Sequence, residues 1–147
     1  MGNRAQVIFE NEDGKGPVVY LHWNGSPESI YTFIRALDHY EVRNDVHYRT
    51  ARFIQLVGNY FGGTLSLGVF AENTFHPSDN GIYVFKWDED KWSVRRMLMG
   101  PGEKEIWLTP EEIDAEKNQA IMHPYNENDQ LFKDVLEKND QFFNKEV

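Results

Sequence analysis

The chain has 147 residues, of which 40% are hydrophobic and 14% aromatic, a composition typical of one globular domain rather than of a disordered segment. Its formal net charge of −9 disfavours direct binding to nucleic acid, because an acidic surface repels phosphate groups. The absence of cysteine excludes disulfides, cysteine-ligated zinc and thiol nucleophiles.

The first half of the chain has the pattern of a hairpin followed by two helices. β-Branched and aromatic residues predict strands over 6–10 and 18–23, separated by a glycine-containing turn. Apolar residues at helical spacing predict helices over 27–40 and 45–60. The apolar residues of the second helix cover more than one face, so we expect this helix to be well buried.

The second half has the pattern of a sheet followed by further helices. Alternating apolar residues predict strands over 64–71, 81–87 and 91–99, with a short additional strand over 105–108. The two faces of the 91–99 strand separate poorly, which favours a position at the edge of the sheet. Thr109 and Glu112 match a capping box that starts a helix, and a final amphipathic helix is expected after Asn126.

These elements predict an α+β fold. We expect an antiparallel sheet of about five strands, in the chain order β-β-α-α-β-β-β, packed on two helices and followed by C-terminal helical additions. The chain is expected to be a single domain over 1–147, with a core over 1–99 and a helical extension over 100–147. We expect one buried cluster to contain Phe33, Ile34, Leu37, Ile54, Val57, Leu67 and Val84.

The junction between the second predicted strand and the first predicted helix is the strongest candidate for a ligand site. Asn24 and Gly25 end the strand in a tight turn, and the helix N-terminus that follows offers backbone N–H groups to a phosphate or carboxylate. The polar side chains around this position belong to His22, Asn24, Ser26 and Ser29. The simpler interpretation is that Ser26 only caps the helix and His22 only fills a strand position.

Arg49 and Arg52 lie one turn apart on the second predicted helix. If this helix faces the junction across a cleft, the two guanidinium groups become candidate contacts for an anionic ligand. The alternative, which we favour, is that both arginines pair with the abundant Asp and Glu side chains of the chain.

Several activities lack a motif in this sequence. The five histidines form no compact metal-ligand pattern, and no serine-hydrolase, P-loop or dinucleotide-binding motif is present. We therefore predict no metal, no cofactor and no catalytic residue. No apolar run is long enough to cross a membrane, and residues 1–6 form no apolar signal region, so we expect a cytoplasmic protein.

Two acidic runs are candidate contacts for a basic protein partner. Asp88, Glu89 and Asp90 lie in a predicted turn, and Glu111 and Glu112 lie at the start of a predicted helix. If these carboxylates share one surface, they can mimic nucleic acid and bind a nucleic-acid-handling complex. The simpler interpretation is that each run is a solvated face.

Three stretches of the sequence resemble a known family. They are Tyr20–Gly25 (YLHWNG), Gly58–Ser66 (GNYFGGTLS) and Asp79–Val84 (DNGIYV). Together they resemble small uncharacterised bacterial proteins found on plasmids, phages and integrated elements, over about residues 2–96. The resemblance implies an accessory protein of a mobile element that is directed at host defence. It implies no reaction and carries over no catalytic residue.

The leading hypothesis is therefore a non-catalytic binding protein that inhibits a host defence complex by protein–protein contact. The acidity of the chain, the lack of catalytic motifs and the resemblance all favour it. The alternative is a binding protein for a small nucleotide-like ligand. A hydrolase with His22 as the base is less favoured, and both alternatives use the His22–Ser29 junction.

Overall fold

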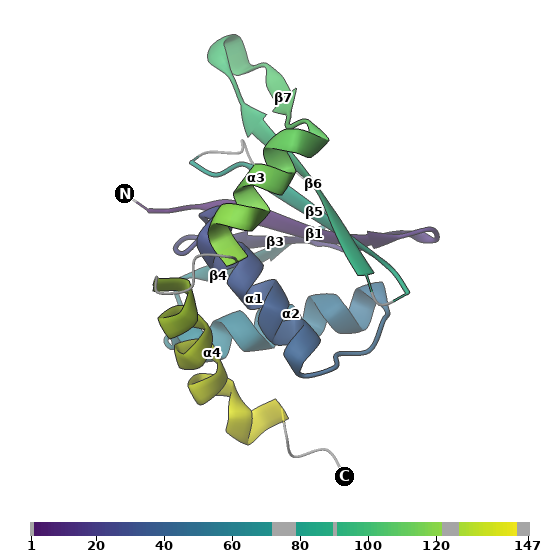
Figure 1. Cartoon of the computed structure of the whole chain (residues 1–147). Coiled ribbons are helices and arrows are strands. Elements are labelled where there is room, and N and C mark those ends of the chain that lie inside the picture. Colours follow the sequence, from purple (N-terminus) through teal and green to yellow (C-terminus); the bar gives the residue numbers. More distant parts are fainter. Residues whose placement is uncertain (1, 72–78, 90, 122–126, 144–147) are drawn as a thin grey trace.

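The computed structural model describes residues 2–71, 79–89, 91–121 and 127–143. Within these residues the chain has an α+β fold, as predicted, with four α-helices and one mixed sheet of seven strands (Figure 1). The strands are β1 (Ala5–Asn11), β2 (Gly14–Lys15), β3 (Val18–Leu21), β4 (Leu67–Phe70), β5 (Ile82–Asp88), β6 (Lys91–Met99) and β7 (Glu105–Trp107). The helices are α1 (Pro27–His39), α2 (Val46–Phe61), α3 (Pro110–Ile121) and α4 (Glu127–Phe143), with a short 3-10 turn η1 (Pro101–Glu103).

The sheet differs from the predicted one in strand direction and strand number. Its order is β4-β3-β1-β5-β6-β7, and β2 forms a hairpin with β1. The prediction of an antiparallel sheet is wrong at its centre, where β1 and β5 run parallel. The physical reason is that β4 and β5 lie on opposite sides of β1, so the chain must cross over between them. A crossover of this kind allows β5 to run parallel to β1. The strands beyond the expected five are the short β2 and β7, of which β7 matches the short strand predicted over 105–108, and β7 rather than β6 lies at the edge.

Alternating side chains divide the sheet into two apolar faces. The face that carries the helices holds the main core, in which Tyr83 and Phe85 of β5 are fully buried. The opposite face holds a smaller cluster of Ile8, Val18, Ile82, Val84 and Met97. The predicted core is confirmed for Phe33, Ile34, Leu37 and Val57, whereas Ile54 and Leu67 are only partly buried and Val84 lies in the smaller cluster.

Local sequence signals set the ends of the helices. Pro27 lies in the first turn of α1, where its missing N–H is not needed. The Asp45 carboxylate caps α2 by accepting hydrogen bonds from two backbone N–H groups of its first turn, at 2.8 and 3.1 Å. Gly62, with a φ of 67°, ends the same helix. The predicted capping box is confirmed, because Thr109 and Glu112 exchange hydrogen bonds of 3.0 and 3.2 Å.

The helices gather around α1 (Figure 1). The main core joins α1 and α2 to the strands, α3 lies beside α1, and α4 packs against both α1 and α2. The fully buried Asn139 anchors α4, since its side-chain amide donates to the Leu56 carbonyl at 3.1 Å and accepts from Asn59 at 2.8 Å. Of the helices that the structure describes, none is long and apolar enough to span a bilayer.

Leu56 and Ile54 make a matched pair for testing how α2 is packed. Leu56 is fully buried, so Leu56→Ala should lower the free energy of unfolding by about 2–5 kcal/mol. Ile54 keeps part of its surface in solvent, so Ile54→Ala should cost clearly less. Urea denaturation of the two variants checks this order, and equal losses for both would contradict the packing described here.

Candidate functional site

The four polar residues of the predicted junction are engaged in hydrogen bonds within the chain. β3 ends at Leu21, so His22 already lies outside the strand. Its Nδ1 is 2.9 Å from the Tyr20 hydroxyl. Asn24 has a φ of 57°, and its side-chain amide donates to the Ser29 hydroxyl at 3.2 Å. The polar groups expected to meet a ligand therefore already have partners within the chain.

The backbone just before α1 also makes hydrogen bonds within the chain. The Tyr83 hydroxyl donates to the Gly25 carbonyl at 2.8 Å, and the Gly25 N–H donates to the Asn3 carbonyl at 2.8 Å. Ser26 holds the N-cap position, as predicted, yet its side chain makes no capping hydrogen bond. The Ser26 hydroxyl instead lies 3.5 Å from the carboxylate of Glu28, whose charge already complements the positive end of the helix. The junction is therefore built for close packing of the chain.

The two arginines predicted to join this site lie at the opposite end of α1. Nη1 of Arg49 is 3.9 Å from the carboxylate of Asp38, which is close to the C-terminal end of the helix. The twelve residue steps from Ser26 to Asp38 span about 18 Å of helix. The structure thus separates Arg49 and Arg52 from His22, Asn24, Ser26 and Ser29.

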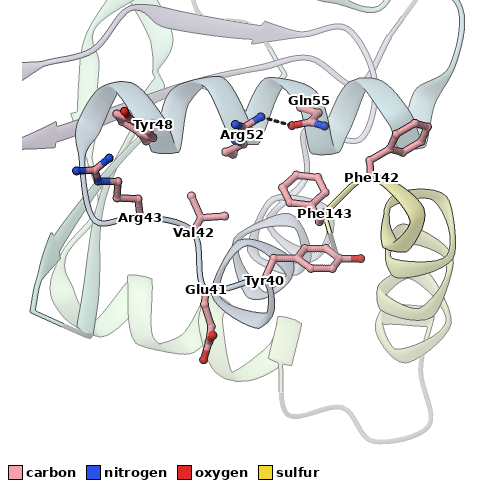
Figure 2. A pocket seen from close by; sticks show the side chains of 9 residues that line it. All are labelled: Tyr40, Glu41, Val42, Arg43, Tyr48, Arg52, Gln55, Phe142 and Phe143. Atoms are coloured by element: carbon pink, nitrogen blue, oxygen red, sulfur yellow. Dashed lines mark hydrogen bonds between the residues drawn. The ribbon is translucent and has the colours of Figure 1, made fainter. Parts of the chain in front are cut away.

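Two hollows flank the connection between α1 and α2, and both arginines line them. The first, the Arg49 hollow, has a volume of about 670 Å³ and is lined by Asp38, Glu41, Val42, Arg43, Asn44, Arg49, Trp87 and Glu89. The second, the Arg52 hollow, has a volume of about 420 Å³ and is lined by Tyr40, Glu41, Val42, Arg43, Tyr48, Arg52, Gln55, Phe142 and Phe143 (Figure 2). The hollows share three residues of the connection, and we call their combined lining the link site.

Arg49 forms the buried floor of the first hollow. Only 6% of its surface is exposed, and its guanidinium lies 3.9 Å from the centre of the Trp87 ring. Nε and Nη1 are buried and make no hydrogen bond to any residue that the structure describes. Burial lowers the pKa of Arg49 and raises the pKa of the Asp38 carboxyl, because both charged forms lose contact with water. The Arg49 guanidinium is therefore held in place by packing on the Trp87 ring and by a weak attraction to the Asp38 carboxylate.

The second hollow combines cationic and aromatic side chains. Figure 2 shows Arg52 on α2 donating to Gln55, at 2.7 Å, with Phe142 and Phe143 approaching from the end of α4. The guanidinium of Arg43 lies 4.6 Å from the centre of the Tyr48 ring. At the rim, Tyr48 is 46% exposed and Phe142 is 48% exposed. This hollow is therefore open to a partner along one side.

Reasoning from the sequence missed most of the link site, including Arg43, Tyr48 and Phe142. They come from the connection, from α2 and from the end of α4, so no local spacing relates them. One sequence signal could have pointed to this site. Tyr48 is a large aromatic residue near the exposed start of the second helix, where neither helix capping nor core packing accounts for it.

The predicted acidic runs lie in two separate places. Asp88 and Glu89 are at the turn between β5 and β6, and Asp90 lies outside the described residues. Glu111 and Glu112 are at the start of α3, which follows Leu108, whose backbone N–H donates to the Arg96 carbonyl about 17 Å along β6 from that turn. Glu112 is also engaged in the capping box. Among the described side chains, no three His, Asp or Glu gather as metal ligands.

Gly25 and Ser26 test whether the junction is a packing device. A Cβ on Gly25 would lie 2.6 Å from the Asn3 carbonyl oxygen, so Gly25→Ala should destabilise the fold by about 1–3 kcal/mol. Ser26→Ala removes no capping bond and should cost less than the roughly 1 kcal/mol of an ordinary N-cap loss. Thermal unfolding measures both, and a costly Ser26→Ala beside a neutral Gly25→Ala would contradict this description.

The link site gathers arginine and partly exposed aromatic side chains, whereas the polar side chains of the junction are bonded to neighbouring side chains of the chain. Comparisons with protein-family models, with curated proteins and with solved structures find no match for this chain. A function has to come from the chemistry of its own side chains, because a fold alone does not specify one.

Proposed function

We propose that this chain is a non-catalytic binding protein that acts by protein–protein contact, and that the link site is its contact surface. The observation that carries the proposal is the open Arg52 hollow, where Arg43 and Arg52 lie among partly exposed aromatic rings. Arginine and tyrosine are enriched among the residues that dominate the energy of protein interfaces. Phe142 at the rim adds an apolar anchor to the same surface.

The shape of the link site favours a protein over a small molecule as the partner. Pockets for small ligands are enclosed and bury most of the ligand. Here two wall residues, Tyr48 and Phe142, keep about half of their surface in solvent. A second hollow continues on the other side of the connection through Glu41, Val42 and Arg43. A surface of this kind suits a protein that covers both hollows at once.

The charge of the link site indicates that its contacts with a partner do not depend only on attraction between an acidic surface and a basic one. Arg43, Arg49 and Arg52 face three carboxylates, so this surface is close to neutral on a chain with a net charge of −9. The carboxylates are those of Asp38, Glu41 and Glu89. The overall acidity steers a basic partner toward the chain, and the link site then supplies the specific contacts.

The proposed partner is a basic component of a host defence complex in the bacterial cytoplasm. The resemblance of the YLHWNG, GNYFGGTLS and DNGIYV stretches to mobile-element proteins supports this class of partner. The proposal does not include imitation of nucleic acid by one acidic array, because the described carboxylates of the two runs lie on separate elements, at the end of β5 with the turn after it and at the start of α3.

The matched aromatic residues provide the test. Tyr48→Ala and Phe142→Ala should each weaken binding to the partner by about 2 kcal/mol, or roughly 30-fold in Kd, because each removes an anchor ring from the interface. Trp23, equally exposed at 46% but at the junction, serves as the control, and Trp23→Ala should leave the affinity unchanged.

The measurement is affinity capture from bacterial cells with the four chains, identification of recovered proteins by mass spectrometry, and titration of the partner found. Recovery of one partner by the wild type and by Trp23→Ala, but by neither link-site variant, is the expected result. A partner lost only with Trp23→Ala would move the contact to the junction and overturn the proposal.

A further inference from the structure

A separate cluster of polar side chains lies beneath α3. The side chain of Arg96, on β6, is 4% exposed, and its guanidinium lies 4.6 Å from the centre of the Tyr83 ring. Nη2 of Arg96 donates to the Asn80 carbonyl at 3.0 Å. Glu116 of α3 closes the cluster by pairing its carboxylate with Nη1 of Arg96. Arg96 is therefore held by the sheet from one side and by α3 from the other.

The closed arrangement leaves three polar atoms without partners. Among the described residues, Nε of Arg96, Oε1 of Glu116 and the Tyr31 hydroxyl are buried and make no hydrogen bond. Burial raises the pKa of the Glu116 carboxyl and of the Tyr31 hydroxyl. Buried polar atoms that lack partners cost free energy, so this contact stabilises the position of α3 less than a fully bonded one would.

Few side chains hold α3 in place. Over residues 110–119, only Ile113, Glu116 and Lys117 are partly buried, at the spacing of one narrow helical stripe. The ammonium of Lys117 lies 4.3 Å from the centre of the Trp92 ring. Two of these three side chains are therefore charged: Glu116 pairs with Arg96, and Lys117 lies over the Trp92 ring. Over residues 110–119, Ile113 is the one apolar side chain that is partly buried, and a segment held mainly by charged side chains can open without unfolding the rest of the chain.

We propose that Arg96, Tyr31 and Trp92 form a binding site for an aromatic ligand that carries a phosphate or carboxylate, and that α3 closes this site with Glu116 in place of the ligand's oxyanion. A guanidinium binds either oxyanion through paired N–H donors. Asn80 and Tyr83 keep Arg96 in position when α3 leaves, and the Tyr31 hydroxyl gains an acceptor.

The aromatic part of the ligand is assigned to Trp92. This ring stacks on Tyr31, with centroids 5.9 Å apart and an interplanar angle of 27°, and Lys117 covers it from α3. Opening of α3 removes Lys117 from the indole and also removes Glu112, whose negative charge acts on Glu116. The opened site thus offers a cation, a hydroxyl donor and an aromatic face to one ligand.

The first test uses Glu116→Gln, which keeps the shape of the side chain and removes its charge. NMR titration with phenyl phosphate should show binding about tenfold tighter than to the wild type, because the competing carboxylate is gone. Benzoate tests the carboxylate class of ligand. Phenol, without the charge, and inorganic phosphate, without the ring, should both bind more weakly than phenyl phosphate. Failure of Glu116→Gln to bind phenyl phosphate or benzoate more tightly than the wild type would overturn the proposal.

The second test separates a ligand site from a purely structural ion pair. Tyr31→Phe removes a hydroxyl that has no partner, so the free energy of unfolding should stay the same or rise. The same change in the Glu116→Gln background should weaken phenyl phosphate binding by about threefold or more, because one donor is lost. Unchanged binding in the double variant would overturn the assignment of Tyr31 to the site, and no binding of phenyl phosphate to any variant would show that Glu116 and Arg96 only fix α3.

Discussion

The alignment of α1 with the central strand β5 is the constraint on which the rest of the structure depends. Three inward aromatic residues of β5 contact the chain just before α1, in its second turn and near its end. The Tyr83 hydroxyl donates to the Gly25 carbonyl, Phe85 lies edge-on to Tyr31, and the Trp87 indole donates to Asp38 at 3.3 Å. Because these contacts recur along the whole helix, sliding α1 along the strand would break all of them together.

This alignment determines which side chains can act together. It places His22, Asn24, Ser26 and Ser29 at one end of α1, and it places Arg49 beside Trp87 at the other end. The link site therefore contains the two arginines that were predicted to contact a ligand, but not the four polar residues of the junction. The third region, beneath α3, depends on the same strand, since Tyr83 supports Arg96 from below.

Most of the secondary structure could be predicted from the sequence because its signals are local. The capping residues Asp45 and Thr109 and the alternation of strands set element ends to within a few residues. The parallel pairing of β1 with β5 could not be predicted, because no residue near either strand specifies a distant neighbour. Val84 was assigned to the wrong face for a related reason: both faces of β5 are apolar, so alternation alone does not say which one the helices cover. The link site was missed because Arg43, Tyr48 and Phe142 meet only after α4 folds back onto α1 and α2.

Hydrogen–deuterium exchange of the chain, free and bound to its captured partner, tests most directly whether the end of α1 is the contact surface. The account predicts that binding protects the amides of the connection between α1 and α2, of the first turns of α2 and of the end of α4. Protection confined to residues 22–29, or to the turn after β5 and the start of α3, would contradict it.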